Sequence, residues 1–498
     1  MIKQTRRGFL KTVLGSIASL GLTSCKSVSV SESFDVCVVG SGPAGAVLAA
    51  ELVRRGARIL LVEGGPLPAV YQRSPSKDVC NLESISESIP YPVEEAHFLG
   101  DGGTSNIWSG DVPRLQPFDF DRRNSYIPSD APWPVTYEEL EQYFQKAEQE
   151  LFVHGEESTS YSPPRAKSFP YSLGSEGNTI NLKRLLGGHG YLVERVPHTL
   201  WEGSVVNVNK THVPPFLSSG KGHFLRGAWI TRVLSGSGRR ITGLEARTLD
   251  HRTMTIRARH YVLACGGIET PRLLLLSRSA EFPHGIGNGS DLVGRYFMEG
   301  PLVRVGTAKL PASRKYANPK DEKAVSWRFY RELKERRLGG AIFEFSLSPA
   351  ESKLTLGAVL EMKPSASNRV VLSEKYKDCF GLPAADVILA MSENERKTWR
   401  HVKEIGRRVF TDLGVKSFEL GSGEGEWCDH HMGTCRMGDD PKTSIVDRNL
   451  KVHGTENLYV TGSAPFVTAG VGGPTLLLTA LSLRLSDHLV EKVLRRGY

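Results

Sequence analysis

The sequence is poor in cysteine, with seven in 498 residues. None of them forms a CxxC pair or a CxxCH motif for haem attachment, so we expect neither a disulfide framework nor a c-type haem. No dense run of lysine and arginine alternates with aromatic residues, which argues against nucleic-acid binding. The uncharged stretch 12–24 has 13 residues, about two thirds of the length that a membrane-spanning helix needs. A permanent transmembrane helix is therefore not expected there.

The overall composition is that of an ordinary globular protein, with 40% apolar and 23% charged residues. A chain of 498 residues is long enough for two or more domains. Its formal net charge is +9, and four of the positive charges, Lys3, Arg6, Arg7 and Lys11, lie in the first 24 residues without any acid. The remainder carries only a mild positive excess.

The first 25 residues are typical of a targeting segment. Residues 5–11, TRRGFLK, resemble a twin-arginine export signal, which carries proteins already folded, and we assign 1–24 to the signal peptide. Residues 22–25, LTSC, resemble a lipoprotein cleavage site, which would make Cys25 the lipidated first residue of the mature chain. We therefore expect a periplasmic protein, tethered to the membrane by a lipid on Cys25.

A strand, a glycine-rich turn, a helix and a second strand follow each other after residue 33. The apolar run 34–40, FDVCVVG, is typical of a buried parallel strand, and the second strand, ARILLVEGG, ends near Glu63. Between them lies GSGPAG, a GxGxxG motif. This order predicts a dinucleotide site in which Glu63 accepts a hydrogen bond from a ribose. The alternative is a glycine-rich turn in an ordinary α/β core.

Each motif residue has a physical task in such a site. Gly40 permits the tight turn, Gly42 lets the backbone approach a pyrophosphate, and Gly45 lets helix and strand pack closely. The helix N-terminus, at Ala44, stabilises negative charge. This unit alone leaves NAD and FAD equally open.

Three further segments resemble one family of flavoproteins. They are the loop 99–115, LGDGGTSNIWSGDVPRL, the segment 260–277, HYVLACGGIETPRLLLLS, and the stretch 428–488 with HHMGTCRMG and GGPTLLLTA. The unit of strand, glycine-rich turn, helix and strand that ends near Glu63 is called the cradle below. Together with the cradle, these segments resemble the glucose-methanol-choline (GMC) oxidoreductases, which oxidise alcohols, and especially their bacterial sugar- and polyol-oxidising branch. The resemblance implies bound FAD. It adds these cofactor candidates to the residues of the cradle: Gly102, Gly103, Thr104, Ser105, Asn106, Ile230, Gly266, Gly462, Gly473, Pro474 and Thr475.

The same resemblance implies an α/β fold, in which a Rossmann-like FAD-binding domain is interleaved with an α+β substrate-binding domain. The first comprises 34–115, 225–300 and 425–498, and the second 116–224 and 301–424. Alternating apolar stretches such as KLTLGAVLEMKP and NRVVLS independently predict an antiparallel sheet in the second. Some relatives attach flavin through a histidine beside the loop tryptophan. Ile107 stands there, so we expect non-covalent FAD.

Two adjacent histidines, His430 and His431, lie between Cys428 and Cys435. The spacing fits no usual zinc pattern, and adjacent residues of an extended chain point to opposite sides, which disfavours one metal ion bound to both. A redox pair of cysteines would lack CxxC geometry. Simple packing of either histidine is the remaining alternative. The resemblance aligns His430 with the family's active-site base, which suits an imidazole near neutral pKa.

Several departures from the family pattern lie near this segment. Gly473 stands where relatives carry a second catalytic asparagine or histidine, and Glu299 and Gly300 stand where they often carry aspartate and histidine. His431 is therefore a second catalytic candidate. We predict an FAD-dependent enzyme that oxidises an alcohol, of a sugar, glycoside or polyol, and passes electrons to oxygen, a quinone or a cytochrome. A nicotinamide-dependent dehydrogenase and a non-catalytic flavin-binding protein are the alternatives.

Overall fold

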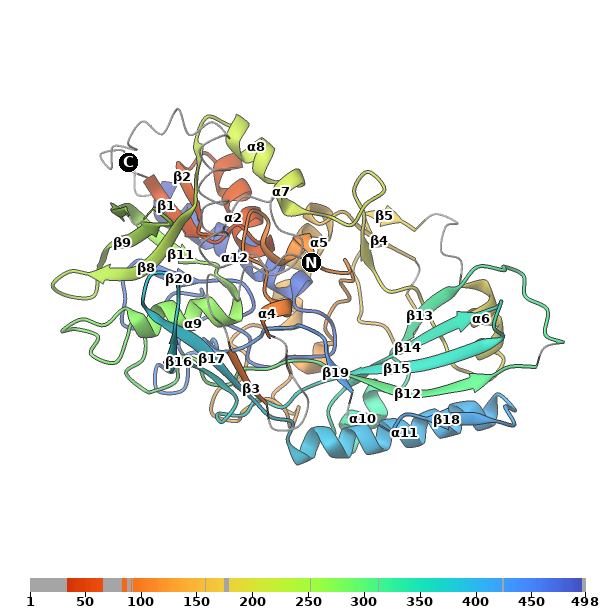
Figure 1. The fold of residues 1–498 in the computed structure, drawn as a ribbon. Helices are drawn as coiled ribbons and strands as arrows, with labels where there is room; N and C mark the ends of the chain where they lie inside the picture. The colour runs from red at the N-terminus through yellow and green to blue at the C-terminus, as the bar shows by residue number, and fades with distance from the viewer. Residues whose placement is uncertain are drawn as a thin grey trace, which may run out of the picture.

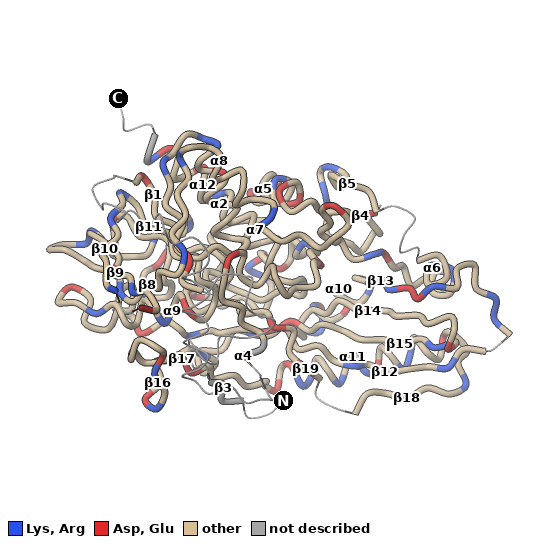
Figure 2. The backbone as a smooth tube through the Cα atoms, turned by 45° about the horizontal axis from the view of Figure 1, so that its top comes forward, with Lys and Arg blue, Asp and Glu red and all other residues tan. Residues whose placement is uncertain are grey.

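The computed structural model describes residues 34–65, 83–86, 91, 93–156, 158–173, 179–250, 252–311, 313–422 and 425–494. The expected export signal and the lipidation site at Cys25 lie outside the described residues. Within the described part, no helix is both long and apolar enough to cross a membrane. Lys and Arg are spread over the surface with Asp and Glu among them (Figure 2).

A five-stranded parallel sheet forms the centre of one lobe (Figure 1). Its strand order is β20, β11, β1, β2, β7, so β1 lies in the middle. All residues of β1 except Asp35 are apolar and buried, as in a parallel strand that is covered on both faces. The strands are β1 (Phe34–Val39), β2 (Ile59–Glu63), β7 (Gly222–Arg226), β11 (Ala258–Leu263) and β20 (Leu458–Val460).

Helices and a small antiparallel sheet surround this parallel sheet. Helix α2 (Pro43–Arg54) packs against α12 (Thr475–Leu494), and α12 in turn packs against α5 (Tyr137–Glu150). The antiparallel sheet has the order β10, β9, β8 and contacts α9. Its strands and the remaining helices of this lobe are β8 (Ala228–Ser235), β9 (Ile241–Thr248), β10 (Thr253–Ile256), α7 (Val208–Thr211), α8 (Val213–Ser218) and α9 (Gly266–Leu276).

The second lobe is built on a six-stranded antiparallel sheet (Figure 1). Helix α11 (Glu393–Asp412) lies along one face and buries Val402, Ile405 and Val409 against it. Its N-terminus is fixed by a capping box between Ser392 and Glu395. The strands are β12 (Pro301–Lys309), β13 (Glu322–Ser326), β14 (Ala341–Ser348), β15 (Lys353–Leu360), β18 (Phe418–Leu420) and β19 (Glu426–Trp427). The expected combination of a parallel and an antiparallel sheet is confirmed.

Short elements pack around the two lobes. The strands β3 (Glu83–Ser86), β16 (Arg369–Lys377) and β17 (Pro383–Leu389) form one small sheet, and β4 (Val153–Gly155), β5 (Tyr171–Ser172) and β6 (His198–Thr199) form another. The remaining helices are α4 (Val93–Ala96), η3 (Gly103–Asn106), η4 (Pro117–Asp119), α6 (Ile180–Gly187) and α10 (Tyr330–Glu335).

Two helices depart locally from the usual pattern near their N-termini. Helix α9 begins at Gly266, and Pro271 lies inside the helix and lacks the N–H that would bond the carbonyl of Gly267. The hydroxyl of Thr434 donates to that carbonyl at 2.9 Å, so the helix continues through the proline. At α5, the hydroxyl of Thr136 accepts from the amide of Glu139, but the carboxylate of Glu139 accepts from Arg448, so a capping box is only half formed.

Candidate active site

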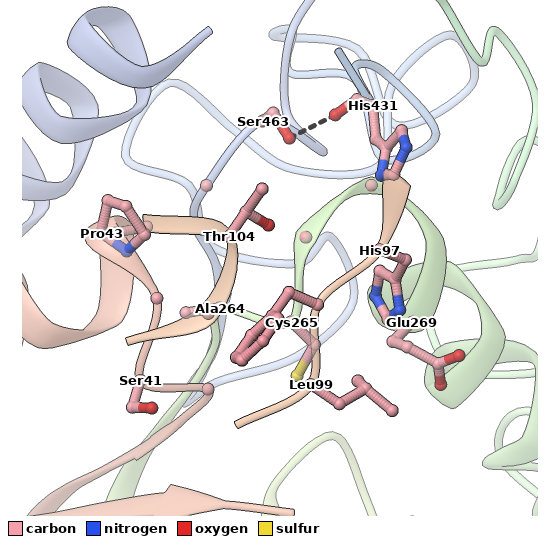
Figure 3. A pocket seen from close by; sticks show the side chains of 18 of the residues that line it. Ser41, Pro43, His97, Leu99, Thr104, Ala264, Cys265, Glu269, His431 and Ser463 are labelled. Carbon is pink, nitrogen blue, oxygen red and sulfur yellow. Dashed lines mark hydrogen bonds between the residues drawn. The ribbon is translucent and has the colours of Figure 1, made fainter. Parts of the chain in front are cut away.

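A cavity of about 410 Å³ opens at the carboxyl ends of β1, β2 and β11, where parallel α/β sheets bind ligands. Residues far apart in the sequence meet in its walls (Figure 3). The candidate residues that line it are Gly40, Gly42, Ala44, Glu63, Gly103, Thr104, Ile230, Gly266, His430, His431, Gly462, Gly473, Pro474 and Thr475. Gly45, Gly102, Ser105 and Asn106 do not line it.

The glycines of the cradle allow three elements to approach closely. Gly40 has φ +99°, and a Cβ there would lie 2.5 Å from the carbonyl oxygen of Ala264. A Cβ on Gly45 would lie 1.9 Å from the carbonyl oxygen of Gly40. Gly45 therefore serves packing inside the cradle, as its position in the motif predicts. Gly42 is the N-cap of α2, without a side-chain cap, so the first-turn amides are left to bind an anion.

Glu63 is held at the end of β2 by three donors. The backbone amide and the hydroxyl of Ser41 donate to its Oε2 at 3.0 and 2.8 Å, and the amide of Gly65 donates to Oε1 at 2.9 Å. Each carboxylate oxygen can accept two hydrogen bonds, so Oε1 keeps one place for a ligand. Burial raises the pKa of Glu63, while these hydrogen bonds lower it. Sequence analysis missed Ser41, because the motif leaves its position unspecified.

In the loop after residue 99, some residues line the cavity and others hold the loop in place. The amide of Gly102, with φ +89°, donates to the hydroxyl of Ser41 at 3.1 Å. The hydroxyl of Ser105 accepts from the amide of Val208 at 3.2 Å, and Asn106 accepts from Asn207 at 2.8 Å. These side chains thus tie the loop to the segment before α7. The neighbouring Gly103, Thr104, Ile107 and Trp108 line the cavity itself.

The wall opposite the cradle carries polar atoms that sequence analysis did not identify. Figure 3 shows His97 between His431 and Glu269, across from Pro43 and Thr104. His97 Nδ1, Glu269 Oε1 and His431 Nε2 are all buried and have no hydrogen-bond partner. Buried polar atoms normally find a partner, so these three fit a ligand with many hydrogen-bonding groups. The cradle on one wall and these atoms on the other suit FAD.

His430 and His431 point in different directions, as expected for neighbours in an extended segment. Ideal Cβ atoms on Gly473 and Gly300 would lie 3.4 Å from Nε2 and 3.3 Å from Nδ1 of His430. The ring of His431 instead contacts those of Tyr91, Phe297 and His97, with centroids 6.0, 6.0 and 6.2 Å away. Its carbonyl accepts from the hydroxyl of Ser463. His431 is therefore packed into a wall, whereas His430 faces the glycine.

Burial keeps both imidazoles neutral. It lowers the pKa of His430 to about 4. The pKa of His431 falls to about 3, because burial is reinforced by His97 and His430. A neutral imidazole has a lone pair that can accept a proton, so His430 is ready to act as a base at pH 7.

Glu299, next to the glycine that flanks His430, positions this segment. Its Oε2 accepts from the backbone amides of Gly300 at 2.7 Å and Cys428 at 3.2 Å. Burial raises its pKa to about 8, and the negative charge of Asp429 adds to the rise. Its bonds to the backbone before His430 fix where the imidazole stands.

The metal and thiol interpretations of this segment find no support in the described residues. No group of three or more His, Cys, Asp or Glu side chains there is arranged to hold a metal ion. Cys428 and Cys435 are free thiols. Cys435 belongs to the hydrophobic core, and burial raises the pKa of its thiol.

Comparisons with known proteins agree with this site. Sequence models described as GMC oxidoreductase match residues 130–297 and 364–482, and one described as an FAD binding domain matches 33–86. The chain is 26% identical to the fructose dehydrogenase large subunit of Gluconobacter japonicus, over 92% of this chain and 98% of the relative. It is 27% identical to paromamine 6'-oxidase of Streptomyces fradiae, over 93% and 92%.

The fold is also shared with a solved structure, pyridoxine 4-oxidase from Mesorbium loti. The TM-score is 0.64 at 18% identity, and the match covers 92% of this chain and 99% of that one. The strands β12 to β15 lie between the two GMC matches in the sequence, the second match includes β18 and β19, and the FAD match covers the cradle. The chain therefore belongs to the GMC oxidoreductase family.

Proposed function

We propose that this FAD-dependent enzyme oxidises a hydroxyl-bearing carbon of a sugar, glycoside or polyol to a carbonyl. The observation that carries the proposal is the neutral imidazole of His430, which faces the cavity beside Gly473. Related proteins are named for fructose, paromamine and 2-methyl-1,2-propanediol, each of which carries at least two hydroxyl groups. The chain binds FAD, and Ile107 in place of the linking histidine supports non-covalent binding.

The residues that line the cavity would have separate roles in binding and in proton transfer. The cradle and Glu63 hold the cofactor, and His97, Glu269 and His431 complete its hydrogen bonds. When bound, FAD supplies the two-electron oxidation. His430 Nε2 accepts the proton of the reacting hydroxyl, which favours oxidation of the carbon atom that carries this hydroxyl.

Helix α12 adds an electrostatic contribution. It begins at Thr475, directly after Pro474, and both residues line the cavity. The amide of Leu478 already donates to the carbonyl of Pro474 at 2.9 Å, so the helix turns regularly from its first residue. The positive end of its dipole stabilises negative charge in the cavity.

A substrate screen of the purified holoenzyme tests this proposal. Sugars, glycosides, polyols and simple alcohols are offered with an artificial dye, with a quinone and with oxygen as separate electron acceptors. We expect turnover of polyhydroxylated substrates, and the acceptor that supports it identifies the class of electron partner. Bound flavin that no alcohol reduces would instead identify a non-catalytic flavoprotein. The nicotinamide alternative is set aside, because the family and the FAD match exclude it.

The fall of kcat/KM on the acid side of its pH profile should occur at an unusually low pH. The base must be neutral to accept a proton, and burial lowers the pKa of His430 to about 4. We therefore expect kcat/KM to fall only as the pH drops through about 4, below the ordinary histidine value of about 6.5. Stopped-flow reduction of the flavin after a rapid pH jump measures this limb. A limb centred near pH 6.5 would contradict the burial of the free base.

We further propose that the enzyme is exported by the twin-arginine route and anchored by a lipid on Cys25. The support is the sequence of residues 5–11 and 22–25. Replacing both Arg6 and Arg7 with lysine should keep the folded flavoprotein in the cytoplasm. Cys25→Ala should leave export intact but release the protein from the membrane fraction. Cell fractionation of the two variants distinguishes the two steps, and unchanged fractions would refute them.

A further inference from the structure

Glycine flanks the imidazole of His430 on both sides. An ideal Cβ on Gly300 would lie 3.3 Å from Nδ1, and one on Gly473 would lie 3.4 Å from Nε2. The backbone of Gly473 is not in the left-handed region, so its conformation does not require glycine. What the glycine provides is space beside the nitrogen that faces the cavity.

The space at Gly473 is bounded by two hydrogen-bond acceptors. The first is the neutral Nε2 of His430, and the second is the backbone carbonyl of Asp111, 3.6 Å from the same ideal Cβ position. In the described part of the chain, neither accepts a hydrogen bond. The side chain of Asp111 is occupied elsewhere, because its Oδ1 contacts Nδ1 of His198 at 2.9 Å.

Among the described residues, the three atoms nearest to an ideal Cβ on Gly473 are Nε2 and Cε1 of His430 and the carbonyl oxygen of Asp111, and none belongs to a hydroxyl, amide or ammonium group. At the position of Gly473 there is only backbone, and burial alone accounts for the lowered pKa of His430, without any hydrogen bond to its ring. Two acceptors side by side in a cavity are incompletely satisfied unless a ligand brings the donors. A single hydroxyl offers one proton and serves one of them.

We infer that the space at Gly473 is a subsite for a second hydroxyl of the substrate, so the enzyme selects alcohols with a hydroxyl on the neighbouring carbon. This inference rests on the proposed function. The reacting hydroxyl donates to Nε2 of His430, and the neighbouring hydroxyl donates to the carbonyl of Asp111. The subsite selects vicinal diols, the pattern that sugars and polyols share, and disfavours simple alcohols.

Cyclohexanol and trans-1,2-cyclohexanediol form a matched pair for the test. Anaerobic mixing with the holoenzyme gives a dissociation constant from the perturbed flavin spectrum and a rate constant from flavin reduction. We expect the diol to bind about tenfold more tightly, as one additional hydrogen bond implies. Equal dissociation constants would overturn the subsite. If the diol binds more tightly but neither compound reduces the flavin, the proposed function fails while the subsite stands.

Gly473→Ala fills the space with one methyl group. Its Cβ would meet only ordinary contacts of 3.4 and 3.6 Å, so the variant should fold and keep its flavin. We expect the diol preference to fall from about tenfold to near unity. Gly289→Ala is the control, because nothing lies within 4 Å of its added Cβ and Gly289 is exposed. A Gly473→Ala enzyme that keeps the full preference would refute the subsite.

Discussion

His430→Ala should leave the flavin bound and slow its reduction by alcohol by about 10²- to 10⁴-fold, the usual contribution of a general base. The imidazole stands beside Gly473 and makes no hydrogen bond that the fold depends on in the described structure. Its removal therefore affects proton acceptance more than cofactor binding. Anaerobic stopped-flow reduction gives the rate, and the visible flavin band gives the occupancy.

His431→Ala is the matched comparison, because it removes the same group from the neighbouring residue. The ring of His431 packs against Tyr91 and Phe297, so its loss should lower thermal stability and weaken flavin retention. Reduction of the flavin that remains bound should change by less than about tenfold. Near-normal reduction in His430→Ala together with a large loss in His431→Ala would reverse the assignment of the base.

Gly45→Ala should abolish flavin binding. The added Cβ would lie 1.9 Å from the carbonyl oxygen of Gly40, so β1, the turn and α2 have to move apart at the cradle. Overpacking of this kind costs about 1–3 kcal/mol of folding free energy, and here it also displaces the amides that would bind the pyrophosphate. The ratio of visible flavin absorbance to protein absorbance after purification measures the loss.

Gly187→Ala provides the control for this change. Gly187 ends α6, and its added Cβ would have no atom within 4 Å. This variant should keep full flavin content and the wild-type melting temperature. A Gly45→Ala protein that is yellow and has the wild-type melting temperature would show that the cradle tolerates a methyl group at this position. That result would contradict the close packing of Gly45 against Gly40.

The sequence predicts the cradle well because its determinants are local. A buried strand, the glycine motif, a helix and a second strand occupy 30 consecutive residues, and each step is fixed by neighbours in the chain. The loop 99–115 and the segment around His430 required a family resemblance, because their positions depend on contacts with distant elements. His430 lies beside Gly473 only in the folded chain.

Other parts of the site could not be predicted, since their roles arise from distant partners. His97 and Glu269 are unremarkable residues in the sequence, and only the fold places their unpaired atoms in one wall with His431. The hydroxyl of Thr434 supplies the donor that Pro271 lacks, so α9 continues through the proline. Ser105 has a comparable role, because its hydroxyl supports the amide of Val208 and not the cavity.

The visible absorption spectrum of the purified protein during anaerobic addition of a polyol tests the central claim most directly. The claim is that the cavity holds FAD next to a neutral His430 that faces the substrate. We predict flavin bands in the resting protein, release of that flavin on denaturation, and bleaching of the bands when the polyol is added. A colourless protein that does not take up FAD, or bound flavin that no alcohol bleaches, would contradict the account.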